Sequence, residues 1–188
     1  PGIDDGAKSL DMSLAMARMA VADGITTLAC TPHIYPGMYM NDAAGIAKAR
    51  DALQAELDAR GIALRLVCGA DVHLVPEVLE GLRSGRIPTL HGGRYLLLEP
   101  SHTTPPPRFE AAVFDIVASG YTPIITHPER LTWVEKHYPV FQRLSDEDHL
   151  AYLCTAHHYH LMRFELTEEA DRFVFRLDPC GSGGRLLR

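Results

Sequence analysis

The sequence has no excess of basic residues. Its 188 residues include 18 Lys and Arg against 24 Asp and Glu, which gives a formal net charge of −6. Proteins that bind nucleic acid through the phosphate backbone present a clustered basic surface, and the sequence offers no such cluster. We therefore expect no nucleic-acid partner.

Long apolar runs are also missing. No segment approaches the roughly 20 apolar residues that a helix needs to span a bilayer, so we expect no membrane insertion. The start of the chain lacks the basic and then apolar pattern of a secretory signal. Because the chain opens on Pro1 instead of Met and closes on a Gly-rich segment, we expect it to be a fragment of a longer protein.

The four cysteines are few and widely separated, with no C-x-x-C pair. A disulfide framework would be denser, and a structural zinc site usually shows paired spacing. We therefore expect reduced thiols in a cytoplasmic protein. Four residues separate Cys180 from Arg185, one fewer than in the loop of cysteine-dependent phosphatases, so we exclude that chemistry.

Residues 1–144 alternate between helical and strand patterns. Apolar spacing predicts helices over 10–21, 42–60, 76–82 and 109–118, and strands over 25–30, 62–68, 95–98 and 122–126. Asp42 is the expected N-cap of the second helix, and 25–30 is expected to be a buried strand. Strands that alternate with helices through short connections predict an α/β fold with a parallel sheet or barrel.

A polar side chain follows each of the four predicted strands. His33 comes after the first strand, Asp71 after the second, Glu99 after the third and His127 after the fourth. The carboxyl ends of parallel strands share one rim, where α/β proteins assemble their sites. Any one of these residues is ordinary at a strand end, so the set of four indicates a site.

Imidazole and carboxylate together suit Mn, Fe or Zn better than Mg or Ca. With Asp5, the four residues offer ligands for more than one divalent ion, and paired ions are typical of hydrolases. Arg130 adds a planar guanidinium that matches phosphate oxygens. Glu99 follows three leucines, and a carboxylate at a buried strand end is costly unless it is paired or bound to metal. These features predict hydrolysis of a phosphate ester.

Six ordered blocks carry a family resemblance. They are Pro-Gly-Ile-Asp-Asp-Gly-Ala-Lys-Ser, Thr-Pro-His, Cys-Gly-Ala-Asp-Val-His, Arg-Ile-Pro-Thr-Leu, Leu-Leu-Glu-Pro and Thr-His-Pro-Glu-Arg. Over residues 1–144 the chain resembles the bacterial capsule-type tyrosine-protein phosphatases of the polymerase and histidinol phosphatase (PHP) superfamily. The resemblance implies a partial distorted (β/α)7 barrel, lacking its first strand and its last βα units, with an irregular C-terminal extension.

The resemblance also implies a manganese-dependent activity, with two or three ions in the intact family. Its substrate would be phosphotyrosine on a membrane-associated tyrosine kinase of capsule or exopolysaccharide export, attacked by a metal-activated hydroxide. Arg130 is implied to bind phosphate. The implied metal ligands are Asp5, His33, Asp71, Glu99 and His127, with Glu99 bridging.

Two alternatives remain open. The chain could be a PHP phosphoesterase acting on a small metabolite such as histidinol phosphate. It could also be an incomplete, non-catalytic fragment, because the family's opening Asp-x-His-x-His motif is missing from its start and the closing Asp-x-His motif does not occur from Ser145 onward.

Residues 145–188 form a tail that matches nothing in the family and has no assigned role. Ser145 and the acids after it predict a helix that runs as far as Phe164. His157 and His160 lie one turn apart on that helix, where we expect a core or surface role. Alternation over 172–177 predicts a half-exposed strand.

Overall fold

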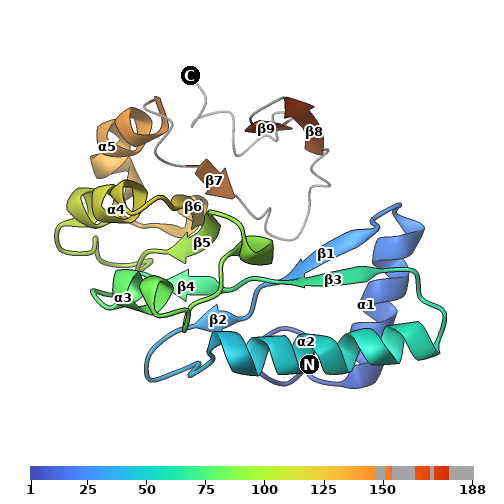
Figure 1. The fold of residues 1–188 in the computed structure, drawn as a ribbon. Coiled ribbons are helices and arrows are strands. Elements are labelled where there is room, and N and C mark those ends of the chain that lie inside the picture. Colours follow the sequence, from blue (N-terminus) through green and yellow to red (C-terminus); the bar gives the residue numbers. More distant parts are fainter. Residues whose placement is uncertain (147–150, 154–163, 170–171, 178–188) are drawn as a thin grey trace. The chain divides into compact units, whose positions relative to one another are not determined.

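A computed structural model describes residues 1–146, 151–153, 164–169 and 172–177 (Figure 1). The chain divides into two compact units, Pro1–Leu153 and Cys154–Arg188. In the second unit, β8 (Phe164–Glu169) pairs antiparallel with β9 (Arg172–Leu177). The strand predicted over 172–177 is thereby confirmed.

Parallel strands form the framework of the first unit. One sheet pairs β1 (Thr27–Cys30) with β3 (Arg65–Cys68). A five-stranded sheet has the order β2-β4-β5-β6-β7 and is parallel throughout. Its strands are β2 (His33–Ile34), β4 (Asp71–His73), β5 (Tyr95–Glu99), β6 (Thr122–Thr126) and β7 (Ala151–Leu153). The predicted α/β class with parallel sheets is confirmed.

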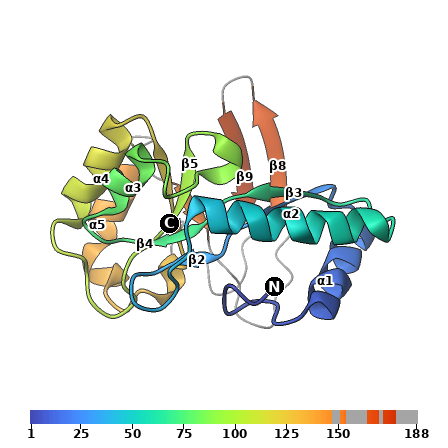
Figure 2. The same cartoon turned by 60° about the horizontal axis from the view of Figure 1, so that its bottom comes forward.

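Helices connect these strands. They are α1 (Leu10–Ala22), α2 (Ala43–Ala59), α3 (Val78–Arg83), α4 (Phe109–Ala118) and α5 (Val134–Asp146), with 3-10 turns η1 (Leu90–Gly92) and η2 (Pro128–Arg130). The helices α3, α4 and α5 gather beside the five-stranded sheet, whereas α1 and α2 lie along β1 and β3 (Figures 1 and 2). Among the described helices, none combines the length and the apolar character that crossing a bilayer requires.

Two apolar clusters hold the elements together. The larger one packs side chains of α3, α4 and α5 against the five-stranded sheet, with Leu96, Leu98 and Ile125 fully buried. The smaller one joins α1, α2 and β3 around Leu57, which is also fully buried. The larger cluster lies beneath the strand ends, so it fixes the positions of the polar residues that follow them.

The prediction that 25–30 is a buried strand is wrong in two respects. The strand begins at Thr27, and most of it is exposed, with Leu28 38% accessible. Among the described residues β1 pairs with one strand only, β3. An apolar run does not reveal how many neighbours a strand has, which explains the error.

The helix predicted from Ser145 to Phe164 is also wrong. Ser145 lies near the end of α5, residues 151–153 form β7 beside β6, and Phe164 begins β8. A further βα unit therefore follows β6, where the sequence analysis found none. A short apolar run fits a strand as well as a helix turn. His157, His160 and the 180–185 segment lie outside the described residues.

Asp42 caps α2 as predicted. Its backbone is extended, and its side chain accepts a hydrogen bond of 2.8 Å from the amide of Gly45. We expect Asp42→Ala to lower the free energy of unfolding by about 1 kcal/mol, because a helix amide loses its acceptor. Urea denaturation will measure this. Asp42→Ser restores an acceptor and should recover most of the loss, and equal stability of the Ala variant and wild type would contradict the capping role.

Candidate metal centre

Two buried carboxylates lie at the rim of the five-stranded sheet. Asp71 begins β4 and Glu99 ends β5, and each is only 5% accessible. Every ion-pair partner found for them among the described residues is a histidine. Burying a carboxylate is costly unless a cation compensates it, so this rim is a place where a positive ion would be favoured.

His33 joins the two carboxylates. Strand β2 places it directly beside Asp71, its register partner on β4. Its Nε2 lies 3.8 Å from Oε2 of Glu99, and one ligand atom from each of the three residues lies within 4.8 Å of the others. The structure therefore brings together three of the predicted ligands, and they come from three adjacent strands.

The N-terminal segment orients His33. Oδ1 of Asp4 accepts a hydrogen bond of 2.8 Å from Nδ1 of His33, whereas Oδ1 of the more exposed Asp5 lies 3.8 Å away. Burial lowers the pKa of His33, but the bond to Asp4 and the nearby carboxylates outweigh it, so the net pKa is raised. When the ring is neutral, as metal binding requires, Nδ1 donates to Asp4 and the lone pair of Nε2 faces Glu99. Asp4 thus acts on the site through His33, a role that the sequence analysis did not predict.

Two further histidines surround Glu99. Nδ1 of His73 lies 3.9 Å from Oε2, and Nε2 of His102 lies 3.0 Å from Oε1. Both nitrogen atoms are buried, and among the described residues neither makes a contact with the geometry of a hydrogen bond. Burial lowers the pKa of His73, which favours the neutral ring. The sequence analysis missed both residues, although His73 is two positions after Asp71 on one strand and therefore shares its face.

His127 reaches the site by a sharp turn. It follows β6 in the left-handed conformation, with φ of 52°, and Pro128 continues the turn into η2. Nε2 of His127 lies 3.7 Å from Oδ2 of Asp71, and its Nδ1 lies 3.9 Å from Oε1 of Glu129. The Glu129 carboxylate, helped by Asp71, raises the pKa of His127 against the effect of burial. His127 therefore meets the cluster on the Asp71 side.

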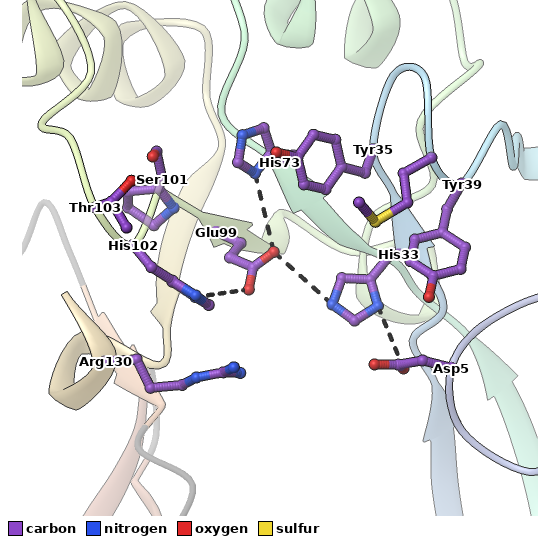
Figure 3. A pocket seen from close by; sticks show the side chains of 12 residues that line it. Asp5, His33, Tyr35, Tyr39, His73, Glu99, Ser101, His102, Thr103 and Arg130 are labelled. Atoms are coloured by element: carbon purple, nitrogen blue, oxygen red, sulfur yellow. Dashed lines mark ion pairs between the residues drawn. The ribbon is translucent and has the colours of Figure 1, made fainter.

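A pocket of about 320 Å³ opens onto this cluster. Asp5, His33, His73, Glu99, His102 and Arg130 all line it. Figure 3 shows the side chain of Arg130 extending from η2 toward the space between Glu99 and Asp5. The predicted phosphate-binding group, Arg130, thus faces the same cavity as three of the five predicted metal ligands, whereas Asp71 and His127 are not among the residues that line it.

The residues present fit a divalent metal. The buried carboxylates of Asp71 and Glu99 lie beside imidazoles, and buried nitrogens of two of these rings make no hydrogen bond within the described part of the chain. That mixture of oxygen and nitrogen donors is the set that Mn, Fe and Zn accept. A bound cation would offset the mutual repulsion of Asp71 and Glu99, so the arrangement suits a divalent cation.

The metal-free protein should be stabilised by Asp71→Asn. Burial is the main factor that raises the pKa of Asp71 to about 6, while the hydrogen bond from Thr126 opposes it. The folded state therefore favours the protonated acid, and stability is lost as the pH rises from about 4 through 6. We expect the substitution to raise the free energy of unfolding by about 2 to 3 kcal/mol at pH 7.5 and to change it little at pH 4.

Denaturation of chelator-treated protein at these two pH values will measure the effect. Asn keeps the acceptor for Thr126, whose hydroxyl donates to Oδ1 at 2.9 Å. Asp115→Asn, at an exposed position on α4, is the matched control and should change stability little at either pH. A gain for Asp71→Asn that is equal at both pH values would contradict the electrostatic cause.

Comparison with known proteins adds a family and a fold. A family model described as "Capsular polysaccharide synthesis, CpsB/CapC" matches residues 1–167. The tyrosine-protein phosphatase YwqE of Bacillus subtilis is 35% identical over 130 residues, which are 69% of this chain and 51% of YwqE. The tyrosine-protein phosphatase CpsB of Streptococcus pneumoniae is 32% identical over 146 residues, which are 77% of this chain and 59% of CpsB.

A solved structure supports the same family assignment. It comes from work on YwqE and CpsB, described there as unique metal-dependent tyrosine phosphatases, and it matches the chain with a TM-score of 0.71 at 32% identity. The match covers 76% of this chain and 60% of the solved one. The chain spans about half the length of the curated relatives it matches.

Proposed function

Because the chain belongs to the CpsB/CapC family of capsular polysaccharide synthesis, we propose that it carries out metal-dependent hydrolysis of phosphotyrosine on a protein. One observation carries this proposal: Arg130 lines the same pocket as His33 and Glu99, two members of the histidine and carboxylate cluster. The relatives named above are tyrosine phosphatases, which supports this choice among phosphate esters.

The fold proposed is a partial distorted (β/α)7 barrel. In its support, β4, β5, β6 and β7 lie in the sheet in the order in which they occur along the chain, with β2 beside β4. This order is typical of a β/α barrel, whereas a doubly wound sheet reverses its order at one point. The phosphatase domain proposed for residues 1–144 takes in β7 as well, because β7 extends the same sheet. The tail that follows has no proposed role.

The proposed metal ligands are Asp5, His33, Asp71, Glu99 and His127. The ligand atoms of His33, Asp71 and Glu99 lie within 4.8 Å of one another, which supports this set. Manganese is the proposed metal, and when bound it would lower the pKa of water and neutralise charge on the phosphate. Asp4 holds the imidazole of His33 in the orientation seen here. Arg130 would bind the phosphate oxygens and orient the ester, since its guanidinium forms paired hydrogen bonds with such groups.

The proposed partner is a phosphotyrosine protein of polysaccharide export, such as a membrane-associated tyrosine kinase, met in the cytoplasm. Family membership supports a role in capsule synthesis. A small metabolite such as histidinol phosphate is the alternative substrate, and an incomplete non-catalytic fragment is the alternative state of this chain.

One experiment tests these proposals. Phosphate release from a phosphotyrosine peptide and from histidinol phosphate is measured on this chain, with added manganese and with a chelator. We expect manganese-dependent release from the peptide. Preferential release from histidinol phosphate would favour the metabolite, and no release from either substrate would favour the non-catalytic fragment.

A further inference from the structure

The segment between β2 and α2 forms one wall of the pocket. Tyr35 and Tyr39 pair as an antiparallel bridge, and the amides of Met38 and Tyr39 both donate to the carbonyl of Tyr35, at 3.0 and 2.8 Å. Gly37 supports this tight turn with φ of +84°, a conformation that side chains disfavour. The wall is therefore a closed turn with a defined shape.

Ring stacking anchors the turn to the site. The ring of Tyr35 lies 3.8 Å from that of His73, centroid to centroid, and the two planes differ by 6°. The ring of Tyr39 stacks on His33 at 5.5 Å, and Figure 3 shows each tyrosine beside its histidine. Asn41 adds two hydrogen bonds of 2.8 Å, to the carbonyls of Ile3 and His33. The turn thus has a fixed position relative to the cluster.

The turn carries two exposed methionines with different surroundings. Met38 is 65% accessible and lines the pocket over the cluster. Met40 is 80% accessible, lines a second pocket of about 290 Å³, and its sulfur accepts from the amide of Gly37 at 3.2 Å. Besides Met38, the wholly apolar side chain lining the first pocket is that of Pro100, a buried residue.

We propose that Met38 selects aryl phosphates over alkyl phosphates by packing against the ring that carries the phosphate. The inference rests on the proposed function, because it takes the phosphate to lie between Glu99 and Arg130. A ring attached to that phosphate must then leave the cluster along the pocket wall. The rings of Tyr35 and Tyr39 on that wall are already stacked on His73 and His33. The exposed thioether of Met38 therefore supplies the apolar contact that distinguishes a ring from an alkyl chain.

The expected size of the effect follows from the contact. A methionine sulfur against an aromatic ring contributes enough to change affinity about threefold to tenfold. An alkyl phosphate has no ring that could pack against Met38, so its affinity should not depend on this residue. The signature of the proposed role is therefore a change in the ratio of the two affinities.

The test measures binding of phenylphosphonate and methylphosphonate by calorimetry, in the presence of manganese. These probes share the phosphonate and differ in the ring, and neither is hydrolysed. Met38→Ala should weaken phenylphosphonate about threefold to tenfold and leave methylphosphonate unchanged. Met38→Leu keeps an apolar side chain and should keep most of the preference. Met40→Ala, on the same turn but facing the other pocket, is the matched control and should alter neither affinity.

Four outcomes separate this inference from the proposed function. A preference for phenylphosphonate that Met38→Ala removes and Met40→Ala keeps supports the role of Met38, even if the chain releases no phosphate from phosphotyrosine peptides. Hydrolysis of those peptides with an unchanged affinity ratio in Met38→Ala overturns the inference and leaves the proposed function intact. Equal affinity of wild type for both probes overturns it too. Equal losses in Met38→Ala and Met40→Ala would assign the effect to the turn as a whole and overturn the specific role.

Discussion

Glu99→Gln is expected to abolish metal-dependent phosphate release. The two oxygens of Glu99 lie within 3.9 Å of nitrogen atoms of His33, His73 and His102, so any cation bound among these rings would share this carboxylate. An amide has the same shape but carries no charge, and its nitrogen does not ligate metal. Because a metal ion contributes several kcal/mol to such reactions, we expect activity to fall by at least about 100-fold.

The measurement joins activity to metal content. Phosphate release from a phosphotyrosine peptide is followed across a manganese titration, and bound manganese is determined by mass spectrometry. Glu80→Gln is the matched control, because Glu80 is exposed and pairs with Arg86 at the surface. This variant should keep both the phosphate release and the manganese content of wild type. A Glu99→Gln protein that binds manganese as wild type does would contradict the central place of Glu99. Unfolding curves of both variants show whether the fold is kept.

The regular part of the fold follows from the sequence. Helix α4 and strand β6 begin and end at the predicted residues, 109–118 and 122–126, because each is a continuous apolar pattern bounded by a turn. Strands β2 and β4 escaped prediction since two or three residues are too short for a periodic signal. Their existence changes the description of the rim: His33 and Asp71 lie within strands, where register pairs them, instead of in loops after strand ends.

The candidate site was predictable only in part, because some of its contacts come from turns. Strand order alone places Asp71 and Glu99 on neighbouring strands, so a rim of carboxylate and imidazole could be predicted from their positions. The parts contributed by turns were not predictable. Asp4, and not Asp5, makes the direct hydrogen bond to His33, and His102 approaches Glu99 because of the turn that follows β5. Such contacts depend on backbone angles that no residue pattern specifies.

Substitution of Arg130 should act mainly on KM. Arg130 is exposed, and it faces the pocket from η2 while the proposed ligands come from the sheet, so its loss leaves the metal cluster intact. Since a hydrogen bond from a charged donor contributes about 1.5 to 3 kcal/mol, we expect Arg130→Ala to raise KM for a phosphotyrosine peptide about 10- to 100-fold at unchanged manganese content. Arg130→Lys keeps the charge but not the planar pair of donors, so its KM should fall between those of wild type and the Ala variant.

Steady-state kinetics at saturating manganese will measure these KM values. Arg83→Ala on α3 is the control, since Arg83 hydrogen-bonds Ser119 and is not among the residues lining the pocket. A fall in kcat with KM unchanged would instead mean that Arg130 acts only in the transition state, and loss of manganese would place it among the groups that hold the metal.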